Sequence, residues 1–241
     1  MGTLVAALPA AVADEHDVRA LEIGEALAIT ADVPAIELNR VLGVVDPLTD
    51  PELHQLDEHF GGRRYAIQVA PGAEALEPRL AERGFERGDG WMKFERDAAP
   101  AELPATELRV EEVDAARSSE FAEALAQGYG LPPWVGEWFT GLLGAPGWHC
   151  FLGYADEEPA AAGALFVTGR TGWLGAAATK EAHRGQGGQG AILAARIARA
   201  AELGCDVVTT ETGAQGGASY RNILRAGFRE AYVRPNWVRP D

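Results

Sequence analysis

The chain has 241 residues, of which 47% are apolar and 24% are charged, and its formal net charge is −15 with an isoelectric point near 4.8. This composition predicts a globular protein with a buried core, in one large or two small domains. The acidity argues against nucleic acid or an anionic membrane as the main partner, because both require a basic face. It suits a cytoplasmic protein, and the longest apolar runs are too short to predict a membrane span.

The first half begins with the apolar stretch GTLVAALPAAVA, which has no basic region before it and is followed directly by DEHD. This predicts the start of a strand or helix and argues against a signal peptide. The elements expected next are an amphipathic helix over 15–29, a strand near 36–45, a helix over 50–60 and a strand over 65–69.

The two halves of the chain end alike, in LEPRLAERGFERGDGWMKFER and SYRNILRAGFREAYVRPNWVR. In both, a short amphipathic helix ends at a glycine, Gly84 or Gly227, which precedes a phenylalanine and a strand with two aromatic residues. We interpret the halves as diverged copies of one unit. The proline-containing segment 97–107 predicts an extended linker between a domain over 1–96 and a domain over 108–241.

The second half predicts strands that are grouped first and alternate with helices later. Its expected elements are a strand over 108–113, helices over 118–130 and 134–144, strands over 148–155, 161–168 and 171–179, a helix over 191–203, a strand over 206–211, a helix over 219–226 and a strand over 230–238. The order predicts an α+β fold with a mixed, mostly antiparallel sheet flanked by helices. Leu193, Ile197 and Ala200 share the helix face that would pack on the sheet.

Cysteine and histidine residues give no metal-binding pattern. Cys150 and Cys205 are far apart and adjoin apolar residues, which predicts two buried, reduced thiols. The five histidines lack ligand spacing with cysteines or paired acids, so we expect no metal site.

The stretch HRGQGGQGA at 183–191 places four glycines at the entrance of the helix over 191–203. Glycine costs about 1 kcal/mol relative to alanine inside a helix, so the cluster indicates a close approach to the backbone. The free N–H groups and dipole of a helix N-terminus favour a phosphate there, with Arg184 as the only cation of the loop. A loop that merely connects strand to helix is the alternative.

Two other phosphate-binding motifs fit this loop less well. Gly185, Gly187 and Gly190 satisfy G-x-G-x-x-G, with Glu211 further on, but the polar insert KEAHR separates the glycines from the preceding strand. Too little chain follows for the remaining strands and helices of a dinucleotide-binding fold. A Walker A loop would need a Lys-Ser or Lys-Thr pair, which Gln189-Gly190-Ala191 does not supply.

The order of strand, HRGQGGQGAILAAR, strand DVVTTE, helix SYRNILRAGF and closing aromatic strand resembles the GNAT superfamily of acyl-CoA-dependent N-acetyltransferases. Arg184, Gly187 and Gln189 fall on the family's Arg/Gln-x-x-Gly-x-Gly/Ala loop, although a glutamine stands where glycine or alanine is usual. The resemblance covers residues 107 to 238, and a weaker trace covers the first half. It implies a tandem arrangement whose N-terminal copy is degenerate and non-catalytic.

The resemblance implies acetyl-CoA as cosubstrate and a primary amine as acceptor, without a metal. The strands on either side of the loop would splay, with the pantetheine arm in between and a backbone N–H holding the thioester oxygen as it gains charge. The implied cofactor contacts are Ala178, Thr179, Arg184, Gly185, Gln186, Gly187, Gly188, Gln189, Gly190, Ser219 and Asn222. Ser219 has the alternative role of a helix cap.

Two residues are candidates for proton transfer. Glu211, at the end of its strand, is the candidate general base, with a solvated or capping glutamate as the alternative. Many relatives have a tyrosine four residues before the helix-ending glycine, where this chain has Ile223. Tyr220 is one turn earlier on the same helix face and is the candidate acid for the leaving sulfur.

The acceptor pocket is expected between the two early helices and the last strand. Its candidates are the aromatic residues Tyr129, Trp134, Trp138, Tyr232 and Trp237, with Glu137 as partner of an ammonium group. Core packing explains each aromatic residue equally well. The acceptor can be a small molecule or a peptide, and both a monomer and a homodimer remain open.

Together, these observations predict an acyl-CoA-dependent N-acyltransferase, an acetyltransferase by resemblance, with its active site in the second half. The alternative is a CoA-binding regulatory or interaction module that keeps the fold without turnover. Gln189 and Ile223, which depart from the family pattern, motivate that alternative.

Overall fold

The computed structural model describes residues 8–101, 103, 106–213 and 216–240. The chain forms two compact units, Met1–Trp91 with Val233–Asp241, and Met92–Tyr232. These bounds differ from the expected domains 1–96 and 108–241, because the last residues of the chain join the first unit. The strand or helix start expected in the apolar stretch 2–13 is a helix from Ala10 onward, and residues 2–7 of that stretch lie outside the described residues, as do residues 102, 104 and 105 of the expected linker.

The first unit consists of short strands and helices that precede the long strand β5. Its elements are α2 (Ala10–Glu15), β1 (Arg19–Ile23), β2 (Ala26–Thr30), the 3-10 turn Ile36–Leu38, β3 (Arg40–Val44), α3 (Asp50–Phe60), β4 (Tyr65–Val69), the 3-10 turn Glu74–Leu76, α4 (Glu77–Glu82) and β5 (Glu86–Asp97), whose second half belongs to the other unit. The predicted helix over 50–60 and strand over 65–69 are confirmed.

The predicted helix over 15–29 is wrong, because this segment forms the antiparallel hairpin of β1 and β2. Ile23 pairs with Ala26, so Gly24 and Glu25 form a two-residue turn, and the φ of 58° at Gly24 is one that glycine adopts without strain. The apolar spacing suits a helix, but β2 also pairs with β3, and this pairing completes a sheet that a helix could not join.

The strand–helix–strand segment β3–α3–β4 is the centre of the first unit, and its two strands are parallel. Thr49 caps α3, because its side chain accepts from the Glu52 backbone N–H while the Glu52 carboxylate accepts from the Thr49 backbone N–H. This capping box satisfies donors that the first helical turn leaves without intrahelical partners. Buried side chains of α3 and β4 build the core, in which Phe60 and Tyr65 stack with ring centroids 3.9 Å apart.

The second unit begins within β5 and ends within β11. Its other elements are β6 (Arg109–Val113), the 3-10 turn Ala115–Arg117, α5 (Ser118–Tyr129), α6 (Pro133–Thr140), β7 (Trp148–Ala155), β8 (Glu158–Thr168), β9 (Thr171–Thr179), the 3-10 turn Glu181–His183, α7 (Gly188–Glu202), β10 (Val207–Thr212), α8 (Ala218–Arg225) and β11 (Arg229–Arg239). The predicted strands over 148–155 and 171–179 are confirmed to the residue, and the fold is mixed, with a mostly antiparallel sheet flanked by helices.

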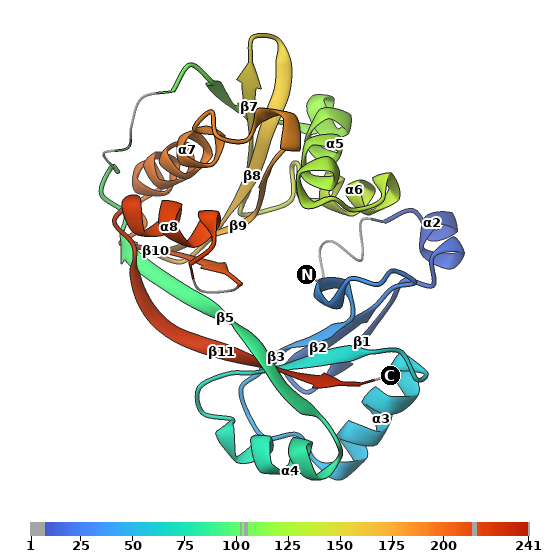
Figure 1. The fold of residues 1–241 in the computed structure, drawn as a ribbon. Helices are drawn as coiled ribbons and strands as arrows, with labels where there is room; N and C mark the ends of the chain where they lie inside the picture. Colours follow the sequence, from blue (N-terminus) through green and yellow to red (C-terminus); the bar gives the residue numbers. More distant parts are fainter. Residues whose placement is uncertain (1–7, 102, 104–105, 214–215, 241) are drawn as a thin grey trace. The chain divides into compact units, whose positions relative to one another are not determined.

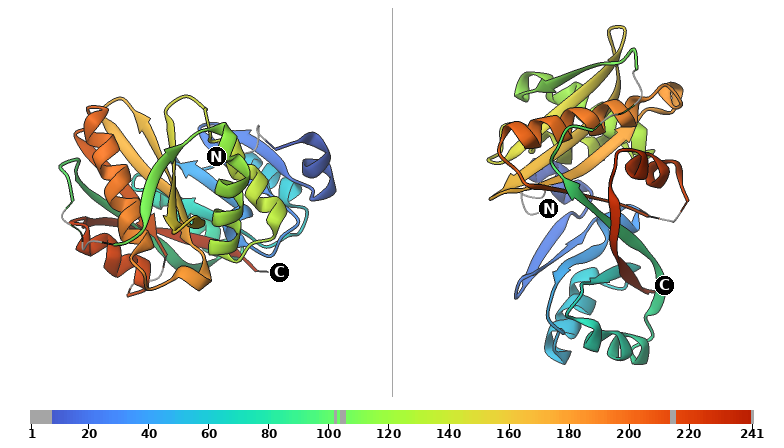
Figure 2. Two further views of the ribbon diagram at one scale, coloured as in Figure 1. Left: turned by 90° about the horizontal axis from the view of Figure 1, so that it is seen from above. Right: turned by 90° about the vertical axis from the view of Figure 1, so that its left-hand side faces the viewer.

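Helices cover both faces of the sheet in the second unit. Helices α7 and α8 lie on one face, and α5 and α6 lie on the other (Figure 1). Figure 2 shows the same separation from above, with the strands between the two pairs of helices. The predicted face of α7 is confirmed, because Leu193, Ile197 and Ala200 are buried in one apolar cluster with strand residues.

Strand pairing repeats from one unit to the other. In each, an antiparallel meander, β1-β2-β3 or β7-β8-β9, is followed by a helix and a strand parallel to the last, β4 or β10. The strand that follows in each half crosses to the other half. β5, which follows β4 in the chain, pairs with β10, and β11, which follows β10, pairs with β4. This exchange explains why residues 233–241 belong to the first unit.

Cys150 and Cys205 are buried free thiols, as predicted. Within the described part of the chain, no helix is long and apolar enough to span a membrane.

Candidate active site

The glycine-rich loop leads from β9 into α7, as the sequence predicts. Helix α7 begins at Gly188, and the preceding Gly187 has a left-handed φ of 86° and no side chain that caps the helix. The first turn of α7 contains no acidic residue. The N–H groups of this turn are therefore available to an acceptor from outside the chain, and the helix dipole favours an anion.

Close packing explains some of the glycines of the loop but not all of them. A Cβ at Gly187 would lie 3.1 Å from Thr106, and one at Gly188 would lie 3.2 Å from Thr179 Cγ2 and 3.3 Å from Ala161 Cβ. By contrast, a Cβ at Gly190 would meet no described atom within 4 Å. Gly190 therefore leaves open space over the first turn of α7 that no packing within the chain requires.

Two contacts hold the loop against the rest of the second unit. Arg184 is exposed, and its guanidinium donates to the Gly128 carbonyl at the end of α5 over 3.3 Å. The Thr106 hydroxyl donates to the Gln186 carbonyl over 2.9 Å. Neither contact uses a loop N–H group, so both fix the loop without occupying its donors.

Gln189 connects the start of α7 to α8. Its side-chain NH₂ donates to the Ser219 hydroxyl over 2.8 Å, and its side-chain carbonyl accepts from the Asn222 amide over 2.7 Å. The structure thus brings together three of the predicted cofactor residues. Gln189, the residue that departs from the expected loop pattern, therefore connects α7 and α8 through its side chain.

Strands β9 and β10 separate next to this loop. Their parallel pairing runs from Thr171 with Val207 to Leu174 with Thr210, and β9 then continues to Thr179 without β10 as a partner. A bulge accompanies the separation, because Ala162 pairs with Ala178 whereas Ala164 pairs with Gly175. Ala178 and Thr179, the predicted pantetheine contacts, therefore lie on the part of β9 that β10 has left.

Glu211 is the first residue of β10 beyond the shared pairing. It forms an ion pair with Lys93, its register partner on β5, and both side chains are 17% exposed. The neighbouring Thr210 points to the opposite face, where its hydroxyl donates to the Leu174 carbonyl over 2.8 Å. The carboxylate of Glu211 therefore lies on the face that α5 and α6 cover.

Tyr220 lies on the other face of the sheet, within α8. Its ring packs edge-on against Phe94, the register partner of Thr210, with centroids 5.1 Å apart. Its hydroxyl donates to the Glu230 carboxylate, and this hydrogen bond, together with burial and the negative charge, raises the pKa of Tyr220. The structure does not bring Tyr220 and Glu211 together, because they occupy opposite faces.

The predicted acceptor residues on α6 adjoin each other. Trp134 and Trp138 meet edge to face with ring centroids 5.9 Å apart, and Glu137 is exposed on the same helix. Trp138 is only 1% exposed, and its indole nitrogen has no hydrogen-bond partner among the described residues. Tyr129, at the end of α5, packs near Phe139 of α6 with centroids 6.2 Å apart.

The aromatic residues expected on the last strand are divided between the two units. Tyr232 is exposed and is the last residue of the second unit. Trp237 is buried in the core of the first unit, where its register partner is Ile67 of β4. Trp237 therefore packs in a core, as the alternative interpretation of the aromatic residues holds.

Sequence reasoning missed two buried cations beside the loop. Lys180 follows β9 directly, its side chain is 8% exposed, and its ammonium group lies 3.1 Å from the Glu123 carboxylate. Arg196 is 1% exposed and lies on the apolar face of α7. A charged residue one turn from Ile192 on an otherwise apolar stripe is the signal that would have identified Arg196.

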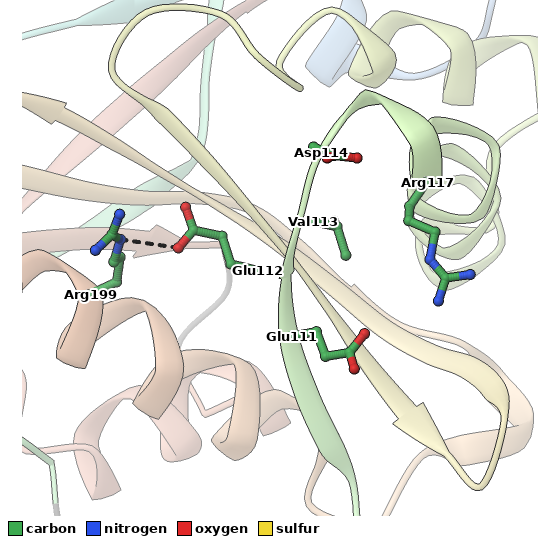
Figure 3. Close-up of a pocket in the computed structure, with 6 residues that line it drawn as sticks. All are labelled: Glu111, Glu112, Val113, Asp114, Arg117 and Arg199. Atoms are coloured by element: carbon green, nitrogen blue, oxygen red, sulfur yellow. Dashed lines mark ion pairs between the residues drawn. The ribbon is translucent and has the colours of Figure 1, made fainter.

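A polar depression of about 440 Å³ lies elsewhere on the second unit (Figure 3). Its lining residues are Glu111, Glu112, Val113, Asp114, Arg117 and Arg199. Glu112 contacts both Arg199, over 3.0 Å, and His149, over 2.7 Å. Arg199 is about three helical turns beyond Gly188, so this depression is separate from the loop. Three of its other charged side chains also have ion-pair partners, Glu112 with Arg199, Arg117 with Glu120 and Glu111 with Arg109.

No group of three or more metal-ligating side chains occurs among the described residues.

Comparison with known proteins gives similarity in structure alone. No family model matches the sequence, and no curated protein matches it. Among solved structures, the chain is similar to a GCN5-related N-acetyltransferase from Kribbella flavida, with a TM-score of 0.66, 18% identity, and 93% of this chain and 90% of that chain covered. A GCN5-related N-acetyltransferase from Sphaerobacter thermophilus gives a TM-score of 0.64 at 16% identity, with coverage of 91% and 83%.

An acetyltransferase of the GNAT family from Colwellia psychrerythraea gives a TM-score of 0.58 at 15% identity, with 95% of this chain and 87% of that chain covered. At these identities the likeness concerns the fold. The chain has the fold of the GCN5-related N-acetyltransferases, over nearly its whole length.

Proposed function

We propose that this chain, which has the GNAT fold, transfers an acetyl group from acetyl-CoA to a primary amine of a small molecule or peptide. The observation that carries the proposal is the uncapped, glycine-rich start of α7 beside the point where β9 leaves β10. The start of α7 suits the pyrophosphate of a CoA thioester, and the separation of β9 from β10 suits its extended pantetheine arm. The proposed active site lies entirely in the second unit.

The start of α7 fits a pyrophosphate without a cluster of basic side chains. Gly187 directs the chain into the helix, and the free N–H groups of the first turn supply donors together with the positive end of the dipole. The open space over Gly190 lets phosphate oxygens approach the backbone. This arrangement matters in a chain of net charge −15, which would otherwise repel a polyanion.

The free edge of β9 fits an extended ligand. Beyond Leu174 the strand pairs with β8 alone among the described residues, so an arm with amide groups can pair with Ala178 and Thr179 in place of β10. In the proposed reaction, a backbone N–H of this segment stabilises the negative charge that develops on the thioester oxygen.

Glu211 is the proposed general base. The acceptor reacts as the neutral amine, its ammonium form having lost one proton to water. Its lone pair attacks the thioester carbonyl carbon, and the Glu211 carboxylate takes the second proton from the nitrogen as the C–N bond forms, directly or through water. The C–S bond breaks as the tetrahedral intermediate collapses, and the thiolate of CoA leaves. Lys93 holds the Glu211 side chain in position until an acceptor amine competes for it.

Tyr220 is the proposed acid that protonates the leaving thiolate. In this role its hydroxyl must exchange the Glu230 carboxylate for the sulfur, because both acceptors require the same proton. The acceptor amine is proposed to bind near Trp134 and Glu137, where an aromatic face and a carboxylate suit a cation, with the buried Trp138 packed edge to face against Trp134.

The first unit is proposed to be a degenerate copy that acts as a scaffold. Its order of meander, helix, parallel strand, helix and strand repeats that of β7 to β11, which supports an origin by duplication. Its helix α3 takes the place of α7 but begins with a capping box in place of a glycine loop. It therefore lacks the feature that binds phosphate in the proposal.

The decisive test is titration of acetyl-CoA by calorimetry into the wild type, Gly190→Glu and Gly190→Gln. The two side chains have the same size and enter the same open space, so only charge distinguishes them. We expect micromolar binding to the wild type, a loss of about 100-fold or more with glutamate, and a clearly smaller loss with glutamine. Wild-type protein that does not bind acetyl-CoA would refute the proposal.

A CoA-binding module without turnover is the second candidate, and one observation favours it. Both proposed catalytic groups already have charged partners, Glu211 with Lys93 and Tyr220 with Glu230. Screening an amine library for thiol release distinguishes the two functions. Binding of acetyl-CoA with no thiol release from any amine would support the module, whereas release that depends on Glu211 would support the enzyme.

A further inference from the structure

Arg196 of α7 is a buried charge without a countercharge. It is 1% exposed, and no carboxylate forms an ion pair with it among the described residues. Its Nε donates to the Ile192 carbonyl over 3.1 Å, and one terminal nitrogen donates to both the Ala164 and Gly175 carbonyls over 3.0 Å. Because a buried charge without hydrogen bonds is costly, these three carbonyls are what compensates the guanidinium.

The two strand carbonyls lie at the point where β9 changes direction. Ala164 and Gly175 are the last register partners before the bulge, and Leu174 is the last residue of β9 that pairs with β10. Ala176, which follows Gly175, has a φ of 41°, a left-handed conformation that alanine adopts only under strain. Arg196 therefore donates to the carbonyl directly before the strained residue, Gly175, and to that of its register partner on β8, Ala164.

The sequence provides room for this guanidinium. A Cβ at Gly163, which faces the bulge, would lie 3.2 Å from Arg196 Cζ and 2.5 Å from Ile192 Cγ2. Any larger side chain at this position would displace the guanidinium or the helix. Burial lowers the pKa of Arg196 to about 10, so the group remains protonated at neutral pH and keeps its donors.

We infer that Arg196 is a positioning residue, which holds the bulge of β9 and thereby keeps the strand apart from β10 where the thioester arm would bind. The inference rests on the proposed function for the identity of the ligand. It concerns only the pantetheine part of that ligand, because the proposed function places the phosphates on the glycine loop, at the start of α7 and about two helical turns before Arg196.

The test compares two ligands that share phosphates but differ in the arm. Acetyl-CoA and 3′-phosphoadenosine 5′-diphosphate, which keeps the pyrophosphate but has no pantetheine, are titrated by calorimetry into the wild type, Arg196→Met and Arg196→Lys. Methionine keeps an apolar stem and removes every donor, whereas lysine keeps the charge with a different donor geometry. Arg199→Met, on the partly exposed side of the same helix, is the matched control.

With Arg196→Met we expect the affinity for acetyl-CoA to fall about tenfold or more, while the affinity for 3′-phosphoadenosine 5′-diphosphate changes less than about twofold. Arg196→Lys should lie between the wild type and Arg196→Met, and Arg199→Met should match the wild type. Adding Ala176→Gly to Arg196→Met should restore part of the affinity, since glycine adopts the left-handed conformation without strain. Equal weakening of both ligands would overturn the inference.

Amide hydrogen exchange gives a readout that does not depend on the ligand. We expect exchange over 176–179 to become about tenfold faster in Arg196→Met, with β1 and β2 of the first unit unchanged. Unchanged exchange at 176–179 in a folded variant would overturn the inference. If the wild type binds neither ligand, the proposed function is wrong, and the exchange result alone then decides whether Arg196 holds the bulge.

Discussion

The starts of α3 and α7 occupy the same place in their units, between two parallel strands, but their chemistry is opposite. Thr49 and Glu52 close the first turn of α3 with the chain's own oxygens, and two acidic residues lie in that turn. The first turn of α7 has neither a side-chain cap nor an acidic residue, and glycines surround it. A helix start that caps itself is a stability device, whereas an uncapped one keeps its donors for a ligand.

The difference between the starts of α3 and α7 predicts that turnover depends on the second unit, which contains the uncapped helix α7. Glu211→Gln should lower kcat about 10²- to 10⁴-fold, because the amide cannot take a proton from the amine, while the affinity for acetyl-CoA is kept. The measurement is thiol release together with calorimetry. Glu58→Gln, on the exposed side of α3, is the control and should leave both quantities unchanged.

A second prediction concerns the bridge between α7 and α8. Gln189→Met keeps the size of the side chain but removes both hydrogen bonds to Ser219 and Asn222, which should cost about 1–2 kcal/mol in the free energy of unfolding. The affinity for acetyl-CoA should fall as well, because the bridge positions two proposed contacts. Urea unfolding and calorimetry measure the two effects.

Gln127→Met on α5 is the matched control, since Gln127 makes one exposed hydrogen bond to Glu123. Equal effects of the two substitutions would show that the bridge has no special role.

A third prediction removes the cap of α3. Thr49→Ala should lower the free energy of unfolding by about 1 kcal/mol, since the Glu52 N–H loses its acceptor, while the affinity for acetyl-CoA stays unchanged. Thr49→Ser should keep most of the stability. Acetyl-CoA binding that appears at the uncapped α3 would contradict the view that the glycines of the loop are also required.

The smallest expected effect is the pH dependence of this cap. Hydrogen bonds from the backbone and side chain of Thr49 lower the pKa of Glu52 below 4.5, so the ionised carboxylate stabilises the folded state above that value. This contribution is lost as the pH falls through the lowered pKa. The difference in unfolding free energy between the wild type and Glu52→Gln should therefore shrink between pH 5 and pH 3, as urea titrations at each pH would measure.

The sequence predictions were right for elements that are decided by residues close together in the chain, and wrong for elements that are decided by contacts between distant segments. Helix α3 and the loop before α7 could be located because caps and glycines act within a few residues. The hairpin of β1 and β2 was mistaken for a helix, because its apolar spacing fits both periods and only pairing with β3 decides between them. Arg196 was missed because its carbonyl partners come from distant strands.

By itself, the sequence determined the glycine loop, the order of the elements in the second half and the resemblance to a GNAT unit. These features are encoded by residues close together in the chain. Only the tertiary structure decided that β5 and β11 exchange partners, that Trp237 belongs to the core of the first unit, and that Glu211 and Tyr220 face opposite sides of a sheet. The physical reason is that strand pairing joins backbone groups irrespective of their separation in sequence, and neighbouring strands then decide which side chains meet.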